Sequence, residues 1–326
     1  MYDYKELGFL NTEKMFEKAF KEQYAVPAFN FVSIEQYNAI IDAVSEKKSP
    51  VILLASPNLH KQLGYEMLAR VSQSGVDRLK SMGIDSQIAL HLDHGMTYDQ
   101  CVDAVENGFS SIMIDGSALS FEENIALTKK VVEYAHAHDV TVEGELGVLS
   151  GVEEQGDDSH EVKESKYTDP ALVEEFVTRT GVDSLAISIG TCHGLVKMTP
   201  NPDGTLPDLR FDILEEVSRR LPEFPIVLHG ASTIPSEYVD MINEYGGKLD
   251  KTIGIPEEQV SKASKLAVCK VNIASDGWIS ALALTRKILA ENPGAIDSRV
   301  FTLKIRPILA ELYKHKIDIM GSSNKL

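Results

Sequence analysis

An α/β fold, specifically a (β/α)₈ or TIM barrel, is predicted by the order of apolar segments along the 326-residue chain. Eight short segments rich in β-branched residues recur, at residues 25–31, 50–56, 88–94, 110–116, 141–147, 184–190, 225–230 and 268–275. A helical pattern separates each segment from the next, which is typical of a parallel sheet covered by helices. Eight such strands close a barrel. No repeat or linker divides the chain, so we expect one domain over residues 1–326.

The helices between these strands carry recognisable start and stop signals. After the third strand, Thr97 is suited to cap the start of a helix and Gly108 to end it. After the fourth strand, Ser120 and Glu123 have the spacing of a capping box. These signals support helices that pack on the outside of the barrel.

Two connections are too long to be simple turns. Residues 148–168 follow the fifth strand and are polar, so we expect an elaborated loop that is a lid, a binding loop or a mobile insertion. The next helix should open at Asp169 and Pro170 and close at Gly181. Residues 231–267 follow the seventh strand with two short helical patterns, and we expect an insertion that serves oligomer contacts or decoration.

The composition argues against several classes of partner. The chain has 32 basic and 49 acidic residues and a formal net charge of −17, so its field repels nucleic acids and anionic membranes. A small phosphorylated substrate is compatible with this charge, because local backbone dipoles and a metal override the global sign. The three cysteines lack paired spacing, and neither a membrane span nor a secretory segment is recognisable. We expect a soluble, cytoplasmic protein.

Residues that carry chemistry gather at the C-terminal ends of the predicted strands. They are Asn30, Ser56, Asp93, His94, Asp115, Glu143, Glu145, His193, His229 and Asn272. The opposite ends of the strands have mainly proline, isoleucine and threonine, so the distribution is not random. Catalytic residues of a (β/α)₈ barrel come from several strand ends at one face, and this pattern therefore predicts an active site.

Three histidines among these residues suggest a zinc site. Catalytic zinc takes about three protein ligands and leaves a position open for substrate, and imidazole suits it as a donor. His94, His193 and His229 follow the third, sixth and seventh strands and can converge on one ion. Taken alone, the stretch IALHLDHG at residues 88–95 fits a capped strand end equally well. His91 is placed to orient a neighbour rather than to bind metal.

Two glycine-containing turns favour phosphate binding. Residues 190–197 (GTCHGLVK) and 230–233 (GAST) put small residues and backbone amides directly after strands, and Lys197 adds a positive charge. The loops after the last strands hold the phosphate in many barrel enzymes. Such turns are common in proteins, so they indicate phosphate binding here only because each lies beside a candidate zinc histidine.

An ordered set of motifs spans nearly the whole chain: HLDHG, IMIDGS, VEGELGVLSGVEE, SIGTCHGLVK, VLHGAS, KVNIAS and GSSNKL. Together they resemble the class II, zinc-dependent ketose-bisphosphate aldolases, the family of fructose-bisphosphate and tagatose-bisphosphate aldolases. The resemblance implies a lyase of carbohydrate metabolism, in glycolysis, on a TIM barrel. Such an enzyme reversibly cleaves a ketose 1-phosphate or ketose 1,6-bisphosphate to dihydroxyacetone phosphate and an aldehyde such as glyceraldehyde 3-phosphate.

The resemblance also implies roles for individual residues. His94, His193 and His229 match the ligands of a catalytic Zn²⁺, and Glu145 matches an alternative or second metal ligand. Asp93 matches the acid/base that serves the C4 hydroxyl. General acid/base groups of this kind contribute roughly 10²- to 10⁴-fold to a rate.

Further catalytic roles fall on the loop after the fifth strand and on the eighth strand. Glu153 matches the acid that exchanges the proton on the dihydroxyacetone phosphate carbon, with Glu154 as the alternative one position away. Glu143 matches a residue of the acidic strand that supports the site. Asn272 is assigned both to catalysis and to substrate binding.

The residues expected to bind substrate are Asn30, Ser56, Gly194, Lys197, Gly230, Ser232, Asn272 and Ser275. All but the first two match the family's cradle for the ketose 1-phosphate, where a monovalent cation, Na⁺ or K⁺, is often bound as well. The expected partner is a sugar phosphate, with neither nucleic acid nor membrane. A homodimer or homotetramer is expected.

The chain departs from the fructose-bisphosphate pattern after Asn272. Members of that type commonly have an aspartate two residues later and an arginine four residues after it, whereas this chain has Ala274 and Trp278. Tagatose-bisphosphate members also lack the aspartate, so Ala274 favours a configuration other than fructose. The missing arginine leaves open a ketose 1-phosphate with a non-phosphate tail. Trp278 is equally suited to packing or to lining a pocket for another aldehyde.

Two other functions compete with the aldolase. A zinc barrel hydrolase or epimerase usually has a His-x-His on its first strand, where this chain has only Asn30 as a polar residue. A non-catalytic sugar-phosphate sensor on the same fold is the other alternative, since fold alone does not establish activity. A sensor has no need of proton relays, so Asp93 and Glu153 favour catalysis.

Overall fold

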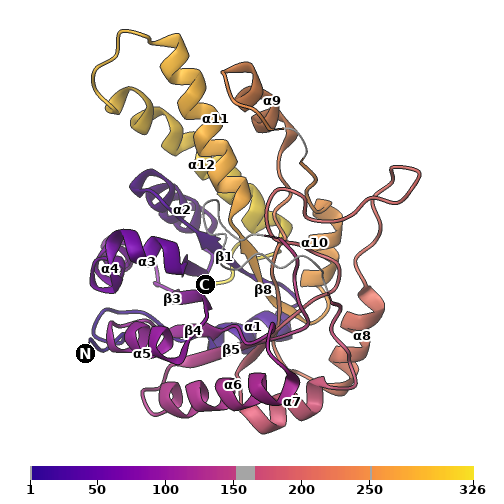
Figure 1. The fold of residues 1–326 in the computed structure, drawn as a ribbon. Coiled ribbons are helices and arrows are strands. Elements are labelled where there is room, and N and C mark those ends of the chain that lie inside the picture. The colour runs from indigo at the N-terminus through magenta and orange to yellow at the C-terminus, as the bar shows by residue number, and fades with distance from the viewer. Residues whose placement is uncertain (1, 152–165, 250–251) are drawn as a thin grey trace.

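The computed structural model describes residues 2–151, 166–249 and 252–326, and these form a closed barrel of parallel strands in the order β1 to β8 (Figure 1). The strands are β1 (Val26–Asn30), β2 (Val51–Ala55), β3 (Ile88–Gly95), β4 (Ser111–Ile114), β5 (Thr141–Leu146), β6 (Ser184–Ile187), β7 (Ile226–Leu228) and β8 (Val268–Ile273). Each lies within or beside its predicted segment. The predicted barrel is therefore confirmed.

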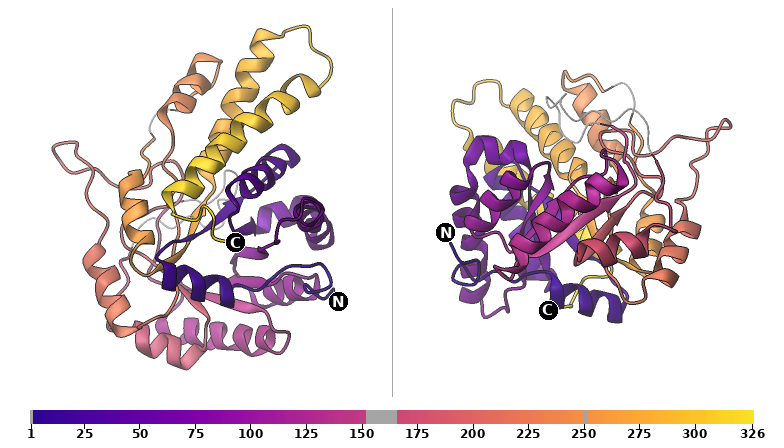
Figure 2. Two further views of the ribbon diagram at one scale, coloured as in Figure 1. Left: turned by 180° about the vertical axis from the view of Figure 1, so that it is seen from behind. Right: turned by 60° about the horizontal axis from the view of Figure 1, so that its bottom comes forward.

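Helices cover the outside of the barrel in alternation with the strands (Figures 1 and 2). They are α1 (Glu13–Glu22), α2 (Ile34–Lys47), α3 (Pro57–Leu63), α4 (Tyr65–Ser81), α5 (Tyr98–Glu106), α6 (Phe121–His136), α7 (Val173–Thr180), α8 (Phe211–Arg220), α9 (Ser236–Glu244), α10 (Glu257–Ser264), α11 (Ser275–Glu291) and α12 (Arg299–Ile319). None of the described helices is long and apolar enough to cross a membrane.

One end of the barrel is filled by the first helix. Met15 and Phe16 of α1 pack in one buried cluster with Val26 and Ala28 of β1 and with Ile52 of β2. The burial of this apolar surface stabilises the fold. It also leaves the opposite end, where the strands finish, as the open mouth.

Most of the helix signals read from the sequence are confirmed. Thr97 caps α5 by accepting from the backbone N–H of Gln100, and Ser120 and Glu123 form the capping box of α6. Gly181 ends α7 with a φ of 75°.

The predicted start of α7 is wrong by three residues. The helix begins at Val173, because Asp169 accepts a hydrogen bond from the N–H of Ala171 and forms a separate turn ahead of it. The Asp-Pro pair marks this turn rather than the first helical residue.

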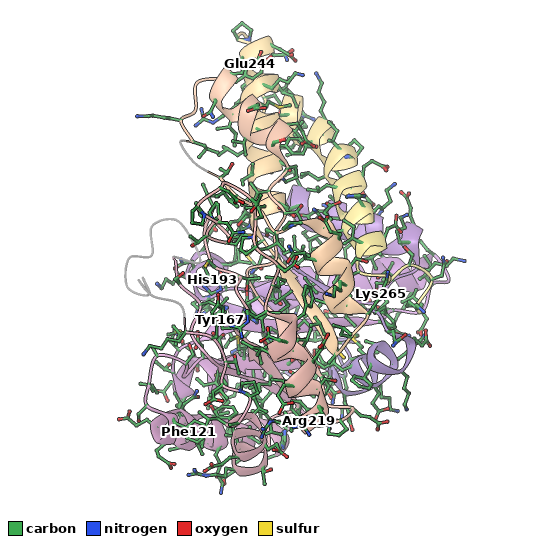
Figure 3. The ribbon with its side chains drawn as sticks, turned by 90° about the vertical axis from the view of Figure 1, so that its right-hand side faces the viewer. Phe121, Tyr167, His193, Arg219, Glu244 and Lys265 are labelled. Carbon is green, nitrogen blue, oxygen red and sulfur yellow. The ribbon has the colours of Figure 1, made fainter. Side chains whose placement is uncertain are left out.

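A projection formed by α9, α11 and α12 extends to one side of the barrel (Figure 1). Glu244, the last residue of α9, lies at its outer tip in Figure 3. Helix α12 also packs along α2, so the projection is anchored on the barrel wall. The predicted insertion after β7 contains α9 and α10, as its two helical patterns indicated.

Candidate active site

The predicted site residues at the strand ends come together at the open mouth of the barrel. Asp93 belongs to β3, Glu143 and Glu145 to β5, and Asn272 to β8, while His229 directly follows β7. All five are buried, with at most 7% of their surface exposed. Parallel strands bring their C-terminal ends to one face, so the convergence follows from the fold.

A bulge in β3 aims two consecutive side chains into this mouth. The pairing with β4 advances from Leu92 to Gly95 on one strand but only from Ile112 to Ile114 on the other, so β3 contains an extra residue. His94 is this extra residue, and its φ is 52°. Neighbouring side chains of a regular strand point to opposite faces, whereas a bulge redirects one of them.

The candidate zinc ligands lie close enough to share one ion. One ring nitrogen from each of His94, His193 and His229 lies within 4.8 Å of the others. The ring centroids of His94 and His193 are 5.0 Å apart and nearly perpendicular, and those of His94 and His229 are 4.6 Å apart. Three imidazoles with an open side form the donor set of a catalytic zinc site.

Two of these histidines have their protons fixed by neighbouring carboxylates. Nδ1 of His94 donates to Asp115 at 3.0 Å, and Nε2 of His229 donates to Glu143 at 2.7 Å. Burial acts to raise the pKa of Asp115, but its bonds with His94 and Ser117 outweigh this and hold it well below the ordinary value.

The remaining nitrogens, Nε2 of His94 and Nδ1 of His229, lie 2.8 Å apart. Each carries a lone pair once its partner nitrogen holds the proton, and two lone pairs at this distance repel unless a cation or a proton lies between them. The donor set therefore fits a metal ion.

A second group of candidate ligands shares one of the histidines. His94, Asp115 and Glu145 offer atoms that also lie within 4.8 Å of one another. Glu145 therefore lies within reach of His94 and Asp115, and its role as an alternative metal ligand stays a prediction. Asp115 was recognised as a strand-end residue, but its contact with His94 was not foreseen.

Two asparagines hold the carboxylate of Asp93. Asn30 donates to Oδ2 at 2.9 Å and Asn272 donates to Oδ1 at 3.0 Å. The amide of Asn272 also lies 3.4 Å from Nδ1 of His229. The other side-chain atom, Oδ1 of Asn272, is buried and has no hydrogen-bond partner among the described residues, so it is free to accept from a ligand in the mouth.

A buried lysine beneath the histidines was missed by the sequence reasoning. Lys270 of β8 donates to Glu143 at 2.7 Å and to Nε2 of His91 at 3.3 Å, and its side chain is fully buried. Burial acts to raise the pKa of Glu143, but Lys270 and His229 keep it well below the ordinary value. Burial and Lys270 both lower the pKa of His91. A buried lysine requires a partner, so the position of Lys270 inside an apolar strand was the sequence signal that could have revealed this contact.

The predicted phosphate-binding residues lie on the loops after β6 and β7 and at the start of α11. Lys197 and Ser232 are buried, and Ser232 accepts a hydrogen bond from the N–H of Ala274 at 3.3 Å. Gly230 has a φ of 64°, and a Cβ there would lie 2.6 Å from the carbonyl oxygen of Cys192. Only glycine therefore allows these two loops to approach so closely.

Gly194 and Ser275 belong to these same segments, whereas Ser56 lies after β2. Gly194 has a φ of 80° in the loop after β6, and Ser275 is the buried first residue of α11. Ser56 accepts from the N–H of Leu59 at 3.2 Å and caps α3, and its expected contact with substrate stays a prediction. Glu153 and Glu154 lie outside the described residues.

The loop after β5 reaches the third histidine. The backbone N–H of His193 donates to the carbonyl of Ser150 at 2.8 Å, and a Cβ at Gly151 would lie 2.5 Å from the carbonyl oxygen of His193. Figure 3 shows His193 and Tyr167 on the same side of the barrel. The loop therefore contributes to the wall of the site.

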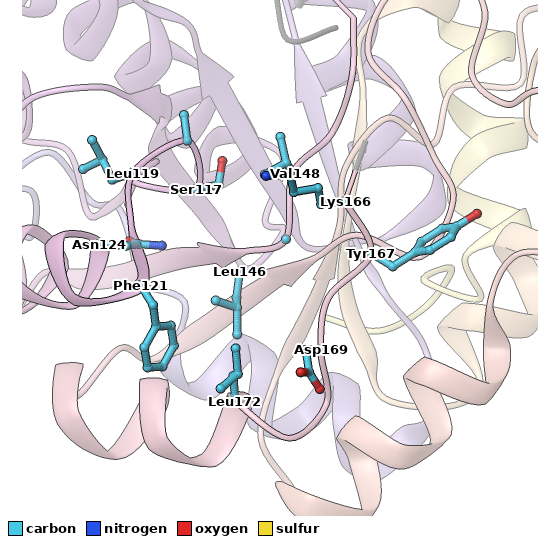
Figure 4. A pocket seen from close by; sticks show the side chains of 12 residues that line it. Ser117, Leu119, Phe121, Asn124, Leu146, Val148, Lys166, Tyr167, Asp169 and Leu172 are labelled. Atoms are coloured by element: carbon cyan, nitrogen blue, oxygen red, sulfur yellow. The ribbon is translucent and has the colours of Figure 1, made fainter. Parts of the chain in front are cut away.

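A neighbouring pocket of about 580 Å³ lies between the loops after β4 and β5 (Figure 4). Its lining includes Phe121, Leu146, Val148 and Tyr167, with Lys166 and Asp169 as charged residues. The histidine cluster does not line it. The arrangement suited to catalysis is therefore the mouth of the barrel rather than this pocket.

Comparison with known proteins identifies the family to which this geometry belongs. The model of the class-II fructose-bisphosphate aldolases matches residues 10–325. The chain belongs to this family. Among its relatives, the fructose-bisphosphate aldolase of Treponema pallidum is 50% identical over the full length of both chains. That of Giardia intestinalis is 37% identical and covers 95% of this chain and 92% of its own.

Solved structures agree with the family assignment. The YdjI aldolase of Escherichia coli K12 has a TM-score of 0.75 and 29% identity, and covers 97% of this chain and 99% of its own. The resemblance read from the motifs is thus confirmed, and the chain is a class II aldolase. This chain is thus similar over most of its length to relatives that carry the fructose-bisphosphate aldolase name, while the substrate preference read from Ala274 stays a prediction.

Proposed function

We propose that this class II aldolase reversibly cleaves fructose 1,6-bisphosphate to dihydroxyacetone phosphate and glyceraldehyde 3-phosphate. The observation that carries the proposal is the position of Asp93 directly beside three convergent imidazoles at the mouth of the barrel. The names of the relatives support this substrate. The whole chain is proposed to act as one catalytic domain.

His94, His193 and His229 are proposed to hold a catalytic Zn²⁺, with Glu145 as an alternative or second ligand. The two facing nitrogens 2.8 Å apart support this assignment. A zinc ion bound there acts as a Lewis acid that stabilises the negative charge developing on the ketose oxygens. Glu143 and Asp115 orient the imidazoles by accepting their other protons.

Asp93 is proposed to take the proton from the C4 hydroxyl in cleavage and to return it in condensation. Asn30 and Asn272 keep both oxygens of its carboxylate in place, which fixes the direction of the transfer. The free oxygen of Asn272 is suited to accept a hydrogen bond from a substrate hydroxyl, so this residue serves both binding and catalysis.

Gly194, Lys197, Gly230, Ser232 and Ser275 are proposed to bind the phosphate of the ketose 1-phosphate. Backbone N–H groups on glycine-rich turns and at a helix start are suited to anions, and Lys197 supplies a positive charge. A monovalent cation, Na⁺ or K⁺, is proposed beside this phosphate.

Glu153 is proposed to exchange the proton on the dihydroxyacetone phosphate carbon, with Glu154 as the alternative. The loop that carries them follows β5, and its described base already contacts His193 through Ser150. A homodimer or homotetramer in the cytoplasm is proposed as the working form of the enzyme.

A second candidate is an aldolase for a ketose 1-phosphate without a distal phosphate. Ala274 and Trp278 support it, because they stand at the start of α11 where the fructose-bisphosphate pattern has an aspartate and an arginine. Nε1 of Trp278 is buried with no hydrogen-bond partner among the described residues. A different aldehyde tail with an acceptor atom would suit that donor.

The proposed function is tested by cleavage of fructose 1,6-bisphosphate before chelation, after chelation and after return of zinc. We expect activity to disappear and to recover with about one zinc per chain. His193→Ala should be inactive, whereas His136→Ala, at an exposed position, should behave as wild type. Activity that survives exhaustive chelation would contradict the proposal.

Borohydride should trap no lysine adduct with substrate, and a trapped adduct would mean a Schiff-base mechanism instead.

A further inference from the structure

A buried ion pair joins the last helix to the start of α11. Nζ of Lys316 in α12 lies 3.1 Å from Oδ2 of Asp276 in α11, and the exposed fractions of the two side chains are 1% and 0%. Lys316 also donates to Glu257 of α10 at 2.9 Å. None of these residues touches the histidine cluster through a hydrogen bond that the described structure contains. The ion pair therefore does not hold the histidine cluster directly, and its contacts lead to another part of the site.

The carboxylate of Asp276 binds the backbone of the turn after β7. It accepts from the N–H of Thr233 at 3.1 Å and from the N–H of Ile234 at 2.6 Å. Ile234 has a φ of 46°, a left-handed conformation that is costly for a β-branched residue. Such a conformation persists only when surrounding contacts enforce it. Asp276 supplies two of these contacts.

Lys316 reinforces the same turn by donating to the hydroxyl of Thr233. Its positive charge faces two carboxylates, Asp276 and Glu257, so it is already neutralised. Lys316 is therefore unsuited to attract a phosphate itself. Its charge instead compensates the buried side chain of Asp276, which holds the turn.

The segment before α10 connects this turn to the loop after β6. The N–H of Lys197 donates to the carbonyl of Ile253 at 2.7 Å, and the N–H of Ile255 donates to the carbonyl of Ser232 at 3.1 Å. A Cβ at Gly254 would lie 1.8 Å from the carbonyl oxygen of Thr233, so the backbones are in close contact. Residues 253–255 therefore form hydrogen bonds with both proposed phosphate-binding loops.

We infer that Lys316 and Asp276 are positioning residues that hold the 230–234 turn in the shape required for phosphate binding. This inference rests on the proposed function, in which Gly230 and Ser232 of that turn contact the ketose 1-phosphate. The pair acts from behind the turn and touches neither the proposed metal ligands nor Asp93. Its loss should weaken phosphate binding while the proton-transfer machinery stays intact.

The test compares Lys316→Met with Lys314→Met in the full-length, zinc-loaded protein. Lys314 lies on the same helix and pairs with Glu46 of α2, so its variant controls for loss of an ion pair on α12. Steady-state kinetics with fructose 1,6-bisphosphate and calorimetric titration with inorganic phosphate are the measurements. Zinc content is determined for each protein.

For Lys316→Met we expect KM to rise about tenfold with kcat within about threefold of wild type, which is the signature of lost uniform binding. The dissociation constant for inorganic phosphate should rise in parallel, with zinc content unchanged. Lys314→Met should match wild type in all three. Glu257→Gln, at a half-exposed side chain, should fold readily and show a smaller change in the same direction.

Wild-type KM and phosphate affinity in both Lys316→Met and Glu257→Gln would overturn the positioning role. Equal losses in Lys316→Met and Lys314→Met would also overturn it, because they would indicate a general effect of destabilising α12. Absence of cleavage by the wild-type protein would refute the proposed function instead. Phosphate titration would still decide whether the pair shapes an anion site.

Discussion

Lys270 and Glu143 form a fully buried ion pair with a separation of 2.7 Å at the floor of the active site. The same carboxylate accepts from Nε2 of His229, so the lysine indirectly sets the orientation of a proposed zinc ligand. A buried carboxylate without its cation would be costly, and it would be a poorer anchor for the imidazole. The pair therefore couples the stability of the barrel to the geometry of its mouth.

Replacing Lys270 by methionine should impair both properties. We expect a loss of about 3–5 kcal/mol in the free energy of unfolding, because Glu143 is left buried and uncompensated. Zinc affinity should fall roughly 10- to 100-fold. Urea unfolding and metal competition measure the two effects, with the exposed Lys265→Met as the control. Unchanged zinc affinity would show that Glu143 orients His229 without help from Lys270.

Asp93→Asn tests the proton transfer at the mouth. The substitution keeps the size of the side chain but removes the carboxylate, so kcat for cleavage should fall about 10²- to 10⁴-fold with zinc content unchanged. Exchange of the proton on dihydroxyacetone phosphate, measured by isotope incorporation, should persist because it is assigned to another residue. Loss of both reactions would mean that Asp93 has a structural role.

The pH dependence of stability should report on Asp42, which joins α2 to α4 and α12. Burial acts to raise its pKa, but hydrogen bonds from Arg306 and Arg78 outweigh this and lower it. Because the pKa of Asp42 is lower in the folded state, its ionised form stabilises the protein at any pH above its unfolded-state pKa of about 4. This contribution disappears as the pH falls through the folded-state pKa.

Asp42→Asn should therefore be less stable than wild type by about 2 kcal/mol at pH 6, with the difference shrinking at more acid pH. Urea unfolding of the chelated proteins at several pH values measures this. Asp240→Asn, at an exposed position, serves as the control and should show no such trend. A difference that stays constant down to strongly acid pH would exclude ionisation of Asp42 as its cause.

Trp278 offers a test of substrate choice. If this position faces the distal end of the substrate, Trp278→Arg should raise the ratio of kcat/KM for fructose 1,6-bisphosphate over fructose 1-phosphate by about tenfold, because a guanidinium binds phosphate in a bidentate manner. Trp278→Phe keeps an aromatic ring without the donor and should leave the ratio unchanged. An unaltered ratio in the arginine variant would assign Trp278 to packing.

Much of this architecture was predictable because strand and helix patterns are local. The eight apolar segments and the caps at Thr97 and Ser120 each depend on a few neighbouring residues, and all were correctly recognised. The histidines were recognisable because a TIM barrel gathers strand ends at one face. Their convergence followed once the strand order was known.

The parts that escaped prediction depend on contacts between distant residues. A regular strand would have turned His94 away from Asp93, and the bulge that prevents this has no clear local signature. Lys270 finds Glu143 across 127 positions. Lys316 and Thr233 are likewise 83 positions apart, so nothing near either residue identified the network around the turn.

The closure of the barrel by β8 also determines when the enzyme becomes active. Asn272 reaches Asp93 across 179 positions, and β8 pairs with β1 to complete the sheet. Contacts so distant in sequence form late, because the loop they close costs entropy. A chain emerging from the ribosome thus contains all three histidines well before it contains β8 or Lys316. Catalytic competence should therefore arrive only after β8 and the helix that carries Lys316 have been synthesised.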